Sequence, residues 1–195
     1  MPIITLLTIA IFIRIANENR FISRYRVPNL PRIEVLIIAF VGPLVLLDQL
    51  HLQPVLRLAW LIVFGVGGLE SLIDAAHHLL PDRLTIPAIL ATLLLAILAG
   101  KVVPACVGAL TWFTTFAFLA LIHPAGLGWG DVKFAALLGL NCAAIRFELI
   151  PTAIVTSVFL GGVYAAALLI SGRRKAQIAF GPFMFLGAVA ALAVA

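Results

Sequence analysis

A succession of long apolar runs constrains the fold of this chain more than any other feature of its sequence. A helix needs roughly 20 apolar residues to cross the hydrocarbon core of a bilayer. Hydrophobic residues make up 64% of the chain and charged residues 11%, which leaves no room for a separate soluble domain. The runs lie at about 1–13, 33–50, 55–76, 84–100, 102–122, 132–145, 149–170 and 178–195. We therefore expect one all-α membrane domain over residues 1–195, a polytopic transmembrane bundle of about eight helices, the first of them short.

The basic residues are divided unevenly between the connections, which predicts an orientation in the membrane. If alternate connections lie on opposite sides, ten lysines and arginines collect on one side and three on the other. The ten are Arg14, Arg20, Arg24, Arg26, Arg32, Arg83, Lys133, Arg173, Arg174 and Lys175; the three are Arg57, Lys101 and Arg146. Cytoplasmic loops are enriched in basic residues, so the loop 14–32 is expected in the cytoplasm and both termini outside it. This bias accounts for the net charge of +5, and we expect no binding to nucleic acid.

The acidic residues gather at the same predicted side. The chain has eight of them, and five fall at or near helix ends expected to be cytoplasmic: Glu34, Glu70, Asp74, Asp82 and Asp131. A charge at the edge of the hydrocarbon is costly unless it is paired, solvated or used. Asp74 ends the run 55–76 and Asp131 begins the run 132–145 from the same side. Two facing carboxylates share a proton and can activate water, which is the chemistry of aspartic proteases.

Local sequence suggests a division of roles within this pair. Asp131 stands where a helix N-cap is expected, with Lys133 two residues further on, and both features favour the charged form of a general base. Asp74, at the C-terminal end of its helix, is then expected to hold the proton. Asp82 is the rival of Asp74 as partner of Asp131, but the sequence Pro81-Asp82 also fits a turn and a cap for the helix 84–100.

The loop before Asp131 is a candidate substrate loop. Its glycines, Gly126, Gly128 and Gly130, allow a tight turn and the close approach of an extended chain. A flexible connection is the alternative interpretation. Trp129, in the same loop, is interpreted with Trp112 as an anchor at the membrane interface rather than as a platform for substrate.

Three further sets of residues have two possible interpretations. Glu70, one turn before Asp74, either hydrogen-bonds the carboxylate pair or has a buried structural role. His77 and His78 have a spacing from Asp74 that fits a metal ligand, but solvated side chains are the simpler interpretation, and we expect neither a metal nor a cofactor. The two cysteines, Cys106 and Cys142, lie inside apolar runs and are expected to be core residues.

Three motifs in this order resemble those of the bacterial prepilin peptidases, also called type IV leader peptidases. This family belongs to the GxGD class of intramembrane aspartyl proteases. The motifs are Asp74 followed by Leu79 to Pro87, then Gly128 to Lys133, then Phe180 to Phe183. Pro31 and Glu34 extend the similarity, so that a peptidase core is expected over about residues 31–187.

The resemblance implies that Asp74 and Asp131 are the two catalytic aspartates. Family members remove a short basic leader from type IV prepilins and from the pseudopilins of type II secretion, at the cytoplasmic face of the bacterial inner membrane. Longer members also methylate the new N-terminus and carry paired Cys-x-x-Cys motifs in a domain between the first two helices. Here that place holds only the loop 14–32, which has no cysteine. Ala76 also stands where many members have a further acid. The resemblance therefore implies a short form with peptidase activity alone.

A small transporter or channel subunit is the main alternative to a peptidase. Asp74, Glu70 and Asp131 would then relay protons or bind a cation. Such a protein is expected to have repeated halves and acids near the middle of the bilayer. The chain shows no clear repeat, and its acids gather at one predicted face, so the peptidase is the preferred prediction.

Overall fold

The computed structural model describes residues 47, 50, 52–122, 126–172 and 177–195. Within these ranges the chain forms six long helices and no strand. They are α4 (Pro54–His77), α5 (Asp82–Leu98), α6 (Val102–Ile122), α7 (Trp129–Ile145), α8 (Leu149–Ile170) and α9 (Gly181–Ala193). They coincide with the last six apolar runs, which confirms the all-α prediction for this part of the chain. The runs 1–13 and 33–50 and the loop 14–32 fall almost wholly outside the described residues, so the count of eight helices stays a prediction.

Three of the described helices, α4, α6 and α8, are long and apolar enough to cross a membrane. Large apolar side chains are exposed along the outer faces of α5, α6 and α8, among them Leu90, Leu94, Val103, Phe118, Phe159 and Ile170. So dense an apolar surface is unusual on a soluble protein, and it suits contact with lipid. The structure is that of a helical membrane protein.

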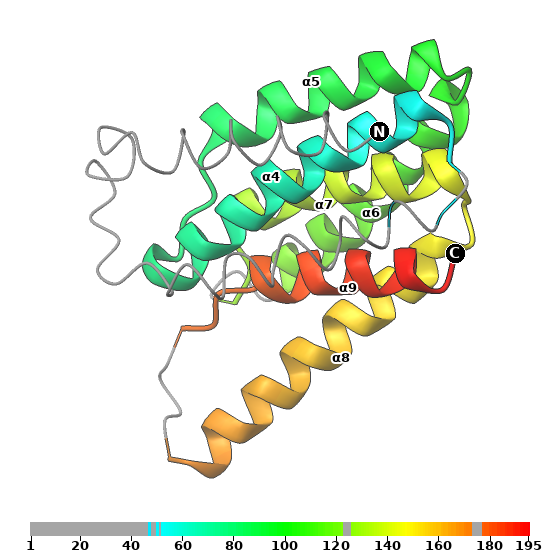
Figure 1. The fold of residues 1–195 in the computed structure, drawn as a ribbon. Helices are drawn as coiled ribbons and strands as arrows, with labels where there is room; N and C mark the ends of the chain where they lie inside the picture. Colours follow the sequence, from blue (N-terminus) through cyan, green and yellow to red (C-terminus); the bar gives the residue numbers. More distant parts are fainter. Residues whose placement is uncertain (1–46, 48–49, 51, 123–125, 173–176) are drawn as a thin grey trace.

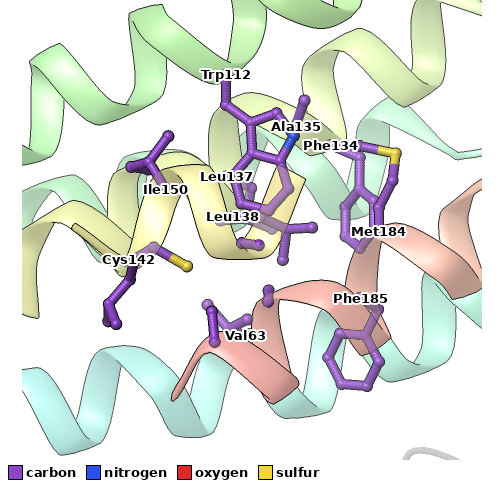
Figure 2. Close-up of a cluster of buried hydrophobic side chains, with 14 of the residues drawn as sticks. Val63, Trp112, Phe134, Ala135, Leu137, Leu138, Cys142, Ile150, Met184 and Phe185 are labelled. Atoms are coloured by element: carbon purple, nitrogen blue, oxygen red, sulfur yellow. The ribbon is translucent and has the colours of Figure 1, made fainter. Parts of the chain in front are cut away.

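Helix α7 forms the centre of the bundle and contacts α4, α5, α6, α8 and α9. It is buried on nearly every side, which is the expected position for a helix that is apolar all round. Figure 2 shows the core cluster about it, with side chains from α4, α6, α8 and α9 packed around those of α7. The labelled residues are Val63, Trp112, Phe134, Ala135, Leu137, Leu138, Cys142, Ile150, Met184 and Phe185.

Glycines set the two closest helix pairs. A Cβ atom on Gly108 of α6 would lie 2.5 Å from the carbonyl oxygen of Gly139 in α7. A Cβ atom on Gly187 of α9 would likewise lie 2.5 Å from the carbonyl oxygen of Ala153 in α8. Small residues let membrane helices approach until their backbones touch. These two contacts therefore fix the spacing of α6 against α7 and of α8 against α9.

The ends of four helices meet at one end of the bundle, on the left in Figure 1. They are the C-terminal end of α4 and the N-terminal ends of α5, α7 and α9. Helices that follow one another in the chain alternate in direction, and α8 diverges from the others toward its C-terminal end. Four of the helix ends that the charge pattern assigns to one side therefore lie together.

Two side chains on α6 depart from the sequence-based expectation. Trp112 is fully buried, so its interpretation as an interface anchor is wrong. Cys106 is exposed, whereas Cys142 on α7 is buried as expected. Because α6 is apolar on every face, its sequence does not show which side turns toward the core.

Candidate active site

Asp74 lies in the last turn of α4, and its carboxylate is 4% exposed. Its Oδ2 atom accepts a hydrogen bond of 2.8 Å from the backbone N–H of Gly181, the first residue of α9. The N-terminus of a helix carries partial positive charge and free N–H groups, which stabilise an anion. The sequence placed Asp74 at the unfavourable end of its own helix. The structure adds the favourable end of a second one.

Asp131 lies in the first turn of α7 and is 8% exposed. Its Oδ2 atom accepts a hydrogen bond of 2.9 Å from the N–H of Gly128. The N-cap is Gly128, three residues earlier, and because glycine has no side chain, Asp131 makes only one half of a capping box, the bond from the N-cap N–H to its carboxylate. The prediction of Asp131 as the N-cap itself is therefore wrong, although the carboxylate still lies at the positive end of the helix.

The two carboxylates interact electrostatically with each other. Each is held through one oxygen atom by a backbone N–H at a helix N-terminus. The other oxygen of Asp131, Oδ1, is buried without a hydrogen-bond partner among the described residues. A buried carboxylate oxygen normally accepts a hydrogen bond, and either a protonated carboxyl group or a water molecule can donate it. The arrangement thus suits two carboxyl groups that share a proton next to a reacting water.

Lys133 and Asp82 form an ion pair beside this site. The Lys133 ammonium lies 2.6 Å from Oδ1 and 2.7 Å from Oδ2 of Asp82. Lys133 was expected to favour the charged form of Asp131, but in the structure its ammonium group pairs with the carboxylate of Asp82. Asp82 was expected to cap α5, yet it is the first residue of that helix and its side chain makes no capping bond. Its charge is instead balanced by Lys133.

Glu70 is fully buried one turn before Asp74. The hydroxyl group of Thr85 on α5 donates a hydrogen bond to its Oε1 atom, and its Oε2 atom has no partner in the described part of the chain. Glu70 therefore joins α4 to α5, as the structural interpretation expected. Thr85 was quoted only as part of a motif, and its contact with Glu70 was not foreseen.

Of the glycines before Asp131, Gly130 serves close packing, and Gly128 has a backbone conformation that does not require glycine. Gly128 is extended, with φ −86° and ψ 159°, and the positive-φ glycines of the described ranges are Gly100 and Gly172. A Cβ atom on Gly130 would lie 3.0 Å from the Cβ atom of Leu80, so the α4–α5 connection presses on this turn. Gly126 and Trp129 are exposed, and their part in a substrate loop stays a prediction.

The family to which the chain belongs follows from comparison with known proteins. The model of the type IV leader peptidase family matches residues 55–166, a region that contains Asp74 and Asp131. The chain therefore belongs to the type IV leader peptidase family.

Similarity to named leader peptidases supports this membership. The chain is 34% identical to the prepilin leader peptidase/N-methyltransferase of Dichelobacter nodosus over 119 residues, which are 57% of this chain and 40% of that protein. It is 30% identical to the protein of the same name from Aeromonas salmonicida over 146 residues, 70% of this chain and 47% of that one. It is 35% identical to the leader peptidase HopD of Escherichia coli over 141 residues, 65% of this chain and 87% of that one. The chain thus spans less than half the length of the first two relatives. No solved structure matches it.

Proposed function

We propose that this protein is an intramembrane aspartyl endopeptidase that removes the leader from type IV prepilins or pseudopilins. Its family membership and the names of its relatives support this activity. The observation that carries the proposal is that two buried carboxylates, Asp74 and Asp131, come from different helices to one end of the bundle, each held by a backbone N–H at a helix N-terminus.

In the proposed reaction, Asp74 and Asp131 share one proton and hold a water molecule between them. The ionised carboxylate takes a proton from the water molecule, and the water oxygen attacks the carbonyl carbon of the scissile peptide bond. The protonated carboxyl group donates a hydrogen bond to the carbonyl oxygen. A proton then passes to the leaving amine as the C–N bond breaks. Asp131 was expected to be the ionised member partly because of Lys133. That lysine binds Asp82, and Asp74 has an N–H donor of its own. We therefore assign the proton to the pair.

The proposal covers peptide cleavage alone. The relatives named as both peptidase and N-methyltransferase match over less than half their length, whereas HopD, named only as a leader peptidase, matches over 87% of its length. The loop 14–32 also lacks the cysteine pairs expected of the longer form. Peptidase activity without methylation is therefore the function to test.

We further propose that the protein is a single domain of eight helices in the bacterial inner membrane, with its active site toward the cytoplasm and both termini outside. The distribution of basic residues supports this orientation. Arg83 and Lys133, two of the ten residues on the basic side, lie at the end of the bundle that holds Asp74 and Asp131. A prepilin whose leader remains in the cytoplasm would reach these carboxylates without crossing the bilayer.

Co-expression with candidate prepilins and pseudopilins tests the activity. Removal of the leader is measured as a shift on a gel, with wild type, Asp74→Ala, Asp131→Ala and Asp82→Ala compared at equal expression. We expect each of the first two alanine variants to lose about 10²–10⁴-fold in rate, or more, because general acid–base catalysis contributes that much. Asp82→Ala is expected to stay active. Full cleavage by Asp74→Ala together with inactivity of Asp82→Ala would move the second catalytic role to Asp82.

A further inference from the structure

The Asp74 carboxylate takes its backbone hydrogen bond from a helix other than its own. The N–H of Gly181 that donates to it lies 107 residues further along the chain, and the bond is buried. Asp131, in contrast, is held by Gly128, the N-cap of its own helix, three residues before it. The position of Asp131 thus depends on one helical turn, whereas that of Asp74 depends on how α9 packs against α4.

The sequence at the start of α9 leaves Gly181 to make this contact. Pro182, the next residue, has no N–H group. The N–H groups of Phe183 and Met184 donate to the carbonyl oxygen of Phe180 at 3.0 and 3.1 Å. Of the N–H groups in the first turn of α9, which a helix leaves without partners in its own backbone, Gly181 therefore supplies the one that can bind Asp74.

Gly181 also has no space for a side chain. A Cβ atom at this position would lie 2.9 Å from Oδ2 and 3.3 Å from Cβ of Asp74. The backbone around it is confined on another side, because the ring of Phe180 lies against Gly161 of α8 and packs on Phe116 of α6. A larger residue at 181 would therefore displace the Asp74 carboxylate or push α9 away from α4.

We propose that Gly181 is a positioning residue that fixes the Asp74 carboxylate for catalysis. The inference rests on the peptidase function proposed above, and Gly181 acts through Asp74 without touching the substrate. By holding Oδ2, its N–H sets the direction of the carboxylate and hence of the oxygen atom that faces the water. Misplacement of a catalytic group by about 1 Å can cost on the order of 10²-fold in rate.

Gly181→Ala tests this role, with Gly162→Ala as the matched control. Gly162 lies in α8, and a Cβ atom there meets nothing within 4 Å. With purified protein and a prepilin substrate, we expect Gly181→Ala to lower kcat about 10²-fold and to leave KM within about twofold. Gly162→Ala should match wild type. A folded Gly181→Ala variant with the kcat of wild type would overturn the inference. If wild type itself leaves every prepilin uncut, the proposed function fails instead.

A second measurement needs neither substrate nor the alanine variant at 181. Labelling phenylalanine with carbonyl ¹³C and glycine with ¹⁵N selects the amides of Gly65 and Gly181, because these two glycines follow a phenylalanine in the sequence. In Asp74→Ala we expect the Gly181 amide proton to move upfield and to exchange faster with solvent, while the Gly65 signal stays in place. An unchanged Gly181 signal would show that the bond to Asp74 does not form, whatever the protein cleaves.

Discussion

Lys133 and Asp82 join the N-terminal part of α7 to the first residue of α5, with both carboxylate oxygens within 2.7 Å of the ammonium group. Lys133 follows Asp131 by two residues. Asp82 comes directly after the α4–α5 connection, whose residue Leu80 packs against Gly130. The ion pair therefore fastens the α4–α5 connection to the helix that carries Asp131, at the edge of the candidate site.

Removing this ion pair should lower the free energy of unfolding only slightly, and high salt should reduce the difference further. The side chains of Lys133 and Asp82 are 37% and 51% exposed, and ion pairs this open contribute about 0.2–1 kcal/mol. A double-mutant cycle with Lys133→Gln and Asp82→Asn, measured by unfolding in detergent, should give a coupling energy in this range. The coupling energy should be smaller at high salt. The swapped variant Asp82→Lys with Lys133→Asp should regain part of the loss. Strictly additive single effects would show that the two charges do not interact.

Thr85→Val should destabilise the protein by about 1–3 kcal/mol, because it leaves the buried Oε1 atom of Glu70 without its donor. The matched control is Thr114→Val in α6, where the exposed hydroxyl bonds only to carbonyl oxygens of its own helix. We expect the control to stay within about 0.5 kcal/mol of wild type. Thermal and denaturant unfolding in one detergent provide the comparison. Equal stability of the two variants would mean that the contact between Thr85 and Glu70 contributes nothing.

Alanine at Gly130 should be less well tolerated than alanine at Gly128. At Gly130 the new Cβ atom would lie 3.0 Å from Cβ of Leu80, whereas at Gly128 its nearest neighbour is 3.6 Å away, an ordinary contact. Overpacking costs about 1–3 kcal/mol, so we expect Gly130→Ala to lower both thermal stability and the rate of leader cleavage. Gly128→Ala should keep most of the stability. The reverse order of the two variants would contradict the packing of the α4–α5 connection described above.

Alanine at Gly108 should separate α6 from α7, because its Cβ atom would lie 2.5 Å from the carbonyl oxygen of Gly139. We expect a loss of about 1–3 kcal/mol or more in unfolding free energy. Gly162→Ala, in open space on α8, should be neutral or slightly stabilising, since alanine favours a helix by about 1 kcal/mol over glycine. Unfolding curves of the two variants decide between these outcomes. A neutral Gly108→Ala would show that the two helices lie further apart.

The sequence predicted the six described helices well because each is a single apolar run ended by polar or glycine-rich residues. It also drew attention to Asp74 and Asp131, two of the few acids in an apolar chain, and the structure buries both; their catalytic role stays a prediction. It did not predict the partner of Lys133. Side chains two residues apart point to different sides of a helix, so Lys133 turns away from Asp131 and meets Asp82, 51 residues earlier.

The remaining errors have a similar origin. Asp131 lies three residues after the N-cap instead of at it because α7 begins earlier than expected, and the extended backbone of Gly128 sets that start. The bond from Gly181 to Asp74 depends on tertiary packing between residues 107 positions apart. The motif that begins at Phe180 was the one signal that α9 belongs to the site, and it did not indicate which atom makes the contact.

The dependence of Asp74 on α9 also sets an order of events during synthesis. When Asp74 is added to the chain, the amide that will hold its carboxylate is still 107 residues from being made, whereas Asp131 is added three residues after its own donor. Synthesis runs from the N-terminus, so α4 is made well before α9. In a growing chain the Asp74 carboxylate therefore lacks its backbone donor until α9 has been made and packed, so the candidate site is complete only once the last described helix has joined the bundle.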